Sequence, residues 1–163
     1  MKNTNYILLT ITVLLIITGC KQKNNADNSG LVKYNTQYPL SALEYTLITN
    51  KEIALVMNQL ETHMSNGRSV IKGEYPIEDE IANAEHTLVM VREAIDSVDT
   101  LYPANGYEDD RLEILRRMEN AYDSLENYRE ALDNNDMGLL EGLIAVMKAD
   151  FTSLKAMFNN PWE

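Results

Sequence analysis

Residues 77–102 read IEDEIANAEHTLVMVREAIDSVDTLY. Apolar side chains recur in this stretch at alternating spacings of four and three residues, the heptad spacing of an amphipathic helix. They are Ile77, Ile81, Ala84, Leu88, Val91, Ile95, Val98 and Tyr102. Acids at 78–80 stand in the first turn, where the helix dipole favours negative charge. The stretch predicts one long helix that buries a single face and that Pro103 ends.

A helix is also expected before this stretch, over residues 41–65. Ser41 and Glu44 have the spacing of a capping box, and Asn66-Gly67 is a typical helix end. Two apolar stripes run along the segment, one of Leu43, Leu47, Ala54, Met57 and Met64 and the other of Ile53, Val56 and Leu60. The apolar pattern lapses at Thr49-Asn50, so a helix broken at that point is the alternative.

Two further helices are expected after Pro103. The first begins after Asp109 or Asp110 and ends at Asn134-Asn135, and the second is capped by Asp136 and ends before Pro161. The apolar stripes are Leu112, Leu115, Met118, Tyr122, Leu125 and Leu132 in the first helix, and Leu140, Ile144, Met147, Phe151, Leu154 and Phe158 in the second. A turn as short as 134–136 makes these two helices antiparallel neighbours.

Four amphipathic segments joined by short connections predict an all-α fold, an up-down-up-down four-helix bundle over residues 41–163. If the first helix breaks near Thr49-Asn50, the alternative is a three-helix core with short additional helices. The 163 residues carry 14 Lys and Arg against 25 Asp and Glu, a formal net charge of −11 at pH 7. Binding to nucleic acid depends on basic contacts to phosphate, so this charge argues against a nucleic-acid partner.

The beginning of the sequence indicates where the protein resides. Lys2 precedes a mostly apolar run from Tyr6 to Ile17, which is too short to span a bilayer and typical of a secretory signal. The residues Ile17, Thr18, Gly19 and Cys20 resemble the lipobox of bacterial lipoproteins: a branched apolar residue, a small residue, Gly and Cys. In that family the Cys thiol receives a diacylglycerol, and signal peptidase cuts before it. The resemblance covers residues 1–20 alone.

The resemblance implies a signal peptide over residues 1–19 and a lipidated Cys with a flexible tether over residues 20–40. The protein would then be held by its lipid on the extracytoplasmic face of the cell membrane. Cys20 is the one cysteine of the chain, so no intrachain disulfide can form. No cofactor other than the covalent lipid on Cys20 is expected.

The sequence contains no recognisable catalytic constellation. It has no Gly-Xaa-Ser-Xaa-Gly motif and no glycine loop of the kind that binds phosphate, and His63 and His86 are its histidines. We therefore expect no enzyme. The predicted function is that of a bundle that binds another protein or the envelope.

A carrier of a small ligand, metal or haem in the bundle core is the alternative function. His86 and Met90 stand one turn apart, and Met57 and Met64 flank His63, so imidazole and thioether could hold copper or haem. His86, however, falls between two positions of the apolar seam and is expected to face solvent. No metal site is predicted on these weak candidates.

The last predicted helix carries a second apolar stripe beside its core stripe. Leu139, Leu143 and Val146 have the i, i+4, i+7 spacing of one helix face. This stripe either widens the buried arc or forms an exposed strip that docks a partner helix or a second copy of the chain. The expected partners are thus the membrane, through the anchor, and an unidentified protein or a second copy.

Overall fold

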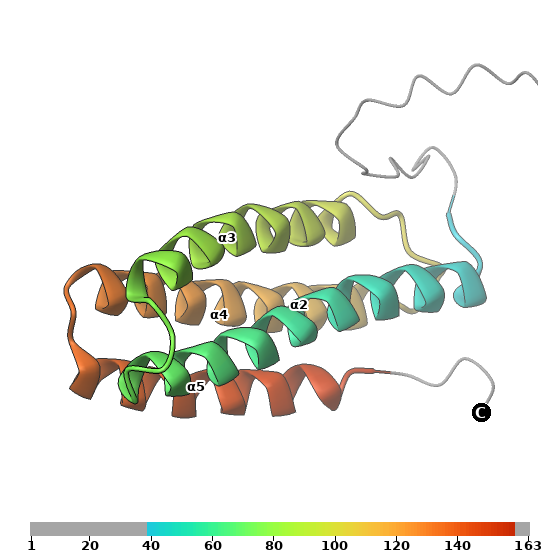
Figure 1. Ribbon diagram of the computed structural model, residues 1–163. Helices are drawn as coiled ribbons and strands as arrows, with labels where there is room; N and C mark the ends of the chain where they lie inside the picture. The colour runs from blue at the N-terminus through green and yellow to red at the C-terminus, as the bar shows by residue number, and fades with distance from the viewer. Residues whose placement is uncertain (1–38, 159–163) are drawn as a thin grey trace, which may run out of the picture. The chain divides into compact units, whose positions relative to one another are not determined.

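The computed structural model describes residues 39–158. The predicted signal peptide, the lipobox-like residues with Cys20 and most of the predicted tether lie outside the described residues. Four helices make up the described part: α2 (Ala42–Ile71), α3 (Ile77–Asp99), α4 (Glu108–Asp133) and α5 (Met137–Lys155). They form an up-down-up-down bundle, so the predicted all-α fold is confirmed (Figure 1).

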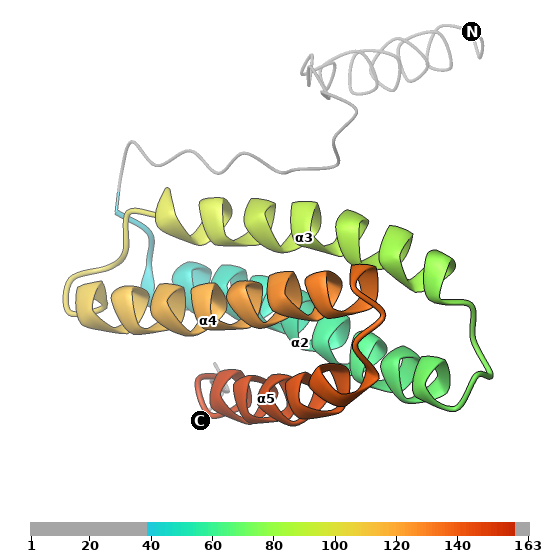
Figure 2. The same cartoon turned by 90° about the vertical axis from the view of Figure 1, so that its left-hand side faces the viewer.

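The helices pack as neighbours around a common core. α2 lies beside α3 and α5, α4 lies beside the same two helices, and α2 and α4 are diagonal partners with few contacts. Figure 2 shows α3 and α5 on opposite sides of the α2 and α4 layer. The turn from α2 to α3 and the turn from α4 to α5 therefore lie at the same end of the bundle (Figure 1).

Two predicted helix starts are confirmed by their side-chain caps. Ser41 Oγ accepts a hydrogen bond from the Glu44 N–H at 3.3 Å, and the Glu44 carboxylate accepts one from the Ser41 N–H at 3.0 Å. This is the reciprocal capping box. At the start of α5, Asp136 Oδ1 accepts a hydrogen bond from the Leu139 N–H at 3.0 Å. Both caps satisfy donors that a helix leaves free in its first turn.

The first helix is unbroken, as predicted, but its predicted end was wrong. The alternative break at Thr49-Asn50 does not occur, and the Thr49 hydroxyl there donates to the Tyr45 carbonyl at 2.9 Å and so binds within α2. The helix does not end at Asn66-Gly67 but continues to Ile71. Gly67 is buried inside α2 and packs against Tyr128 of α4, so its small size serves helix packing instead of a helix end.

Two boundaries around Pro103 also differ from the prediction. α3 ends at Asp99 with Thr100 as its C-cap, and Leu101, not Tyr102, is buried after it. Tyr102 is 55% exposed. α4 begins at Glu108, before the acids expected to cap it, and Tyr107 occupies the N-cap position without a side-chain hydrogen bond.

The buried faces of α2, α3 and α4 contain polar residues that a search for apolar side chains passes over. On α2 the buried positions Thr49 and His63 continue the line of Ile53, Val56 and Leu60. The predicted stripe members Leu43, Leu47, Leu112 and Phe158 are exposed instead. The apolar stripes expected from the sequence therefore included residues that face solvent and missed polar residues that face the core.

Candidate functional site

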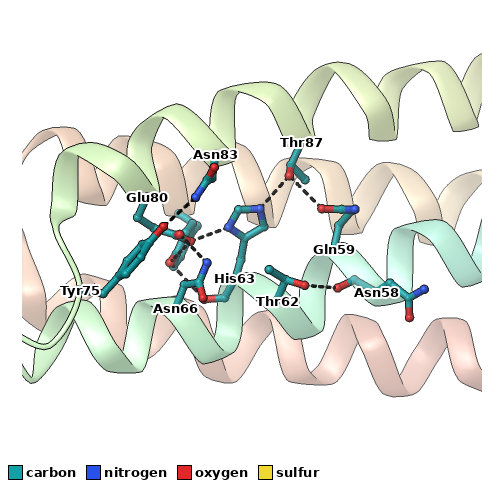
Figure 3. Close-up of polar contacts among 10 residues, drawn as sticks. Asn58, Gln59, Thr62, His63, Asn66, Tyr75, Glu80, Asn83 and Thr87 are labelled. Carbon is teal, nitrogen blue, oxygen red and sulfur yellow. Dashed lines mark hydrogen bonds and ion pairs between the residues drawn. The ribbon is translucent and has the colours of Figure 1, made fainter.

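A cluster of polar side chains lies inside the bundle where α2, α3 and α4 meet. Glu80 of α3 is at its centre and is 0% exposed. Its Oε1 lies 2.6 Å from Nδ1 of His63 and accepts a 2.9 Å hydrogen bond from the Tyr128 hydroxyl. Its Oε2 accepts a 2.8 Å hydrogen bond from Asn66 Nδ2. One carboxylate therefore joins three helices, and Figure 3 shows His63 and Asn66 pointing toward it.

Both ring nitrogens of His63 are engaged in hydrogen bonds. Its Nε2 lies 2.8 Å from the hydroxyl oxygen of Thr87, and that hydroxyl donates its proton to Gln59 Oε1 at 3.0 Å. Since the Thr87 proton is used in this bond, His63 Nε2 is the donor to Thr87. His63 Nδ1 shares a 2.6 Å hydrogen bond with the Glu80 carboxyl group, and this contact is an ion pair when the imidazole is protonated.

This cluster is sealed and its hydrogen bonds are complete. Its members His63, Glu80, Thr87 and Tyr128 are each at most 3% exposed. Across residues 39–158, Arg111 Nε is the buried side-chain nitrogen or oxygen without a hydrogen-bond partner, and it lies outside the cluster. A buried polar network makes a fold more rigid when every one of its groups is hydrogen-bonded, as here. The cluster therefore fixes how three helices meet.

Tyr128 closes the cluster from the side of α4. Its hydroxyl lies 3.1 Å from the His63 carbonyl oxygen, and its ring packs on Gly67 of α2. A Cβ at Gly67 would lie 2.7 Å from the Tyr128 oxygen, closer than real Cβ contacts. Burial, together with the charge of Glu80, raises the pKa of Tyr128 well above its usual range. Tyr128 is therefore a neutral hydrogen-bond donor inside the bundle.

The candidate metal ligands are not brought together. His63 is buried with both ring nitrogens hydrogen-bonded, whereas His86 is exposed on α3, as expected, and Met90 is half-buried. A ring nitrogen that is already engaged in a hydrogen bond to Glu80 or Thr87 is not free to bind a metal. Residues 39–158 contain no group of three or more His, Cys, Asp or Glu side chains placed to hold a metal ion.

The sequence reasoning did not find Glu80 and Thr87. They stand four residues before and three residues after Ala84, at the spacing of a helix seam. The buried line of α3 runs through Glu80, Ala84, Thr87, Val91, Ala94, Ile95 and Val98. A glutamate and a threonine in register with that line were the available signal of a buried polar pair.

A groove on the surface runs between α2 and α5. It consists of two adjoining hollows of about 440 and 360 Å³, and Arg68 and Lys148 line both. The remaining lining residues of the first are Ile71, Lys72, Glu141, Ile144 and Ala145, and those of the second are Glu61, Met64, Ser65 and Phe151. The groove thus has an apolar lining and two cations at its middle.

These cations differ from most others in the bundle. Residues 39–158 contain ten Lys and Arg against 23 Asp and Glu, and six of those ten cations lie within 4.0 Å of a carboxylate. Among the described residues, Arg68, Lys72, Lys148 and Lys155 form no such ion pair. Three of these four line the groove. In so acidic a bundle, the groove concentrates positive charge that no residue of the bundle neutralises by direct contact.

The predicted partner stripe lies on the other edge of α5. Leu139 and Val146 are 52% and 47% exposed, and Leu143 is half-buried and packs against the core. Leu139 stands nine positions before Lys148, about two and a half helical turns, so the two side chains leave α5 in opposite directions. The stripe and the groove are therefore separate surfaces.

Comparisons with known proteins give no relative. No family model, no curated protein and no solved structure matches this chain. Among the described helices, none combines the length and apolar character that crossing a bilayer requires. The function is therefore argued from the residues and the groove.

Proposed function

We propose that this chain is a lipoprotein held on the extracytoplasmic face of a bacterial cell membrane, and that its bundle binds another protein without catalysing a reaction. The lipobox-like residues 17–20 support the location. The groove between α2 and α5 carries the proposal of binding, because its three cations have no carboxylate within 4.0 Å and its lining is largely apolar. Such a surface is suited to a partner that brings both apolar side chains and negative charge.

Two contacts favour this function over a carrier in the bundle core. A carrier that uses His63 needs a lone pair on its imidazole, and both ring nitrogens are hydrogen-bonded to Glu80 and Thr87. Freeing the ring would leave the buried Glu80 carboxyl group without its hydrogen bond to His63, at a cost of about 1–3 kcal/mol. The groove, by contrast, is open without any rearrangement.

The location is tested by the variant Cys20→Ser in the producing bacterium, with labelled fatty acid and detergent-phase partitioning as readouts. Wild-type protein takes up label and enters the detergent phase, because two or more acyl chains hold a protein on a membrane. Cys20→Ser takes up no label. The matched control Ser29→Ala lies outside the lipobox and behaves as wild type. Label that persists in Cys20→Ser overturns the proposed anchor.

The binding role is tested separately, by chemical cross-linking in intact cells and recovery of the wild-type protein. A defined additional protein is expected in the cross-linked product. Recovery of the chain alone, without any cross-linked protein, contradicts this half of the proposal.

A further inference from the structure

The groove between α2 and α5 carries a charge opposite to that of the bundle, because Arg68, Lys72 and Lys148 line it against Glu61 and Glu141. The described residues carry a formal −13, from ten cations and 23 acids. Arg68 and Lys148 stand in the part shared by both hollows, and Lys72 lies beside them. Two carboxylates also line the groove, Glu61 in one hollow and Glu141 in the other. The middle of the groove is therefore positive.

The shape of the groove favours an elongated occupant. Its lining on α2 and the C-cap of α2 runs from Glu61 to Lys72, eleven residue steps or about 16 Å along the helix axis. That length corresponds to about three turns of a second helix. The apolar lining includes Ile144 and Met64, each 7% exposed, and half-buried Phe151, which lie where the apolar face of such a helix would rest.

The charges identify the kind of helix. An amphipathic helix placed in the groove brings its flanking residues close to Arg68 on one wall and Lys148 on the other. Carboxylates at those positions would neutralise cations that have no partner in the bundle, whereas basic residues there would be repelled. The groove thus complements an acidic amphipathic helix.

Other occupants fit the charge distribution less well. A membrane rich in anionic lipid presents negative charge to the whole face of the bundle, whose formal −13 repels it. A second copy of the chain brings another bundle of the same charge into contact. A short helical segment of a partner brings its carboxylates to the groove alone.

We propose that the groove between α2 and α5 is a docking site for an acidic amphipathic helix of a partner protein, with Arg68, Lys72 and Lys148 binding its carboxylates. This inference rests on the proposed binding function and names its surface and the chemistry of the partner. The carboxylates dock by charge-assisted hydrogen bonds, and the apolar face of the helix rests on Ile144 and Phe151.

The test uses the full lipidated chain in nanodiscs of zwitterionic phosphatidylcholine. The probe is a labelled 16-residue helical peptide with leucines at i, i+3, i+4 and i+7 positions flanked by glutamates, and binding is followed by fluorescence anisotropy. A matched peptide has glutamine in place of every glutamate. The acidic peptide is expected to bind at least tenfold more tightly than the glutamine peptide, and its affinity is expected to fall as salt is added.

The protein variants are Arg68→Glu and Lys148→Glu, with Lys155→Glu as the matched control. Lys155 is also without an ion pair but lies outside both hollows. All four side chains concerned by the proposal and its control are exposed, so the variants are expected to melt as wild type does. The two groove variants are expected to weaken acidic-peptide binding at least tenfold, and the control is expected to leave it unchanged.

Several outcomes overturn the proposal. Equal binding of the two peptides, or equal effects of Lys155→Glu and Lys148→Glu, removes the assignment to the groove cations. Absence of binding by the acidic peptide at millimolar concentration does the same. Binding to phosphatidylglycerol vesicles that Arg68→Glu abolishes assigns the groove to lipid, and a dimer that Arg68→Glu dissociates assigns it to a second copy. Failure here leaves lipidation at Cys20 intact, so it is distinguishable from failure of the proposed location.

Discussion

His63 Nδ1 lies 2.6 Å from Glu80 Oε1, and the two side chains, from α2 and α3, are 1% and 0% exposed. Removing one partner of a buried, hydrogen-bonded pair leaves the other group unsatisfied, and the cost is about 3–5 kcal/mol where the pair is ionised. Glu80→Ala is therefore expected to lower the free energy of unfolding by about that amount, because it also removes the acceptor of Asn66 and Tyr128. Urea unfolding followed by circular dichroism measures the change.

The exposed pair Arg92 and Glu119 is the control for this prediction. Their nearest atoms are 2.8 Å apart, but the side chains are 42% and 43% exposed. Exposed ion pairs contribute at most about 1 kcal/mol. Glu119→Ala is thus expected to have a small effect. If Glu80→Ala and Glu119→Ala lowered the free energy of unfolding by similar amounts, burial of the cluster would add nothing to the stability of the bundle.

Gly67 and Tyr128 give a second prediction. In an exposed part of a helix, Gly→Ala stabilises by roughly 0.5–1 kcal/mol. At Gly67 the new methyl group would meet the Tyr128 oxygen at 2.7 Å and Ile144 Cδ1 at 3.1 Å. We expect Gly67→Ala to destabilise the bundle by about 1–3 kcal/mol, since overpacking outweighs the gain in helix propensity. Thermal unfolding measures the change.

Gly142 is the matched glycine for that experiment. It is exposed within α5, and a Cβ there meets no atom within 4 Å. Gly142→Ala is expected to raise the melting temperature, because the helix propensity gain is unopposed. A stabilising Gly67→Ala would contradict the close packing of α2 on Tyr128.

The polar cluster and the groove show which parts of the structure can be predicted from the sequence and which cannot. The heptad spacing of α3, the capping box of α2 and the N-cap of α5 depend on local spacing, so they were predictable without knowledge of the partner helices. The role of Gly67 was not, because Asn66-Gly67 is a helix-ending pair by local rules and Tyr128 lies 61 residues further along the chain. Likewise His63 and Glu80 read as ordinary polar residues until two helices are packed together. The cations of the groove can be recognised as unpaired only once the structure shows which carboxylates the other cations contact.

Alkaline pH gives a third prediction. Burial raises the pKa of Tyr128, with the charge of Glu80 adding to it, and burial likewise raises the pKa of Tyr45 beside Asp110. A tyrosine whose folded pKa exceeds its unfolded value stabilises the fold below the unfolded value, about pH 10, and this stability is lost as pH rises toward the folded value. We therefore expect the bundle to lose stability steadily above about pH 10.

Phenolate absorbance and urea unfolding check this pH dependence. Tyr45 and Tyr128 are expected to ionise only as the protein unfolds, because burial raises the pKa of both hydroxyls. Tyr128→Phe should flatten the decline of stability above about pH 10, because one of the shifted groups is gone. Titration of every tyrosine before unfolding would contradict the burial of these two hydroxyls.

The N-cap of α5 gives a fourth prediction. Asp136 Oδ1 accepts a 3.0 Å hydrogen bond from the Leu139 N–H, and its charge lies at the positive end of the helix dipole. Asp136→Ala is expected to cost about 1 kcal/mol, and Asp136→Asn about half of that or less because asparagine also caps. Thermal unfolding at low and high salt separates the hydrogen bond from the charge. Equal costs for both variants would leave the side-chain hydrogen bond without a role.

The apolar stripe of α5 gives the last prediction. Leu143 is half-buried against the core, whereas Leu139 and Val146 are 52% and 47% exposed. A fully buried Leu→Ala change costs about 2–5 kcal/mol, so we expect about half of that for Leu143→Ala. The double change Leu139→Ser with Val146→Ser is expected to alter stability by less than about 1 kcal/mol, since exposed positions contribute little. Thermal unfolding compares the two, and sedimentation velocity shows whether the strip joins copies of the chain. A double variant that melts as far below wild type as Leu143→Ala would place the whole stripe in the core and end its candidacy as a partner surface.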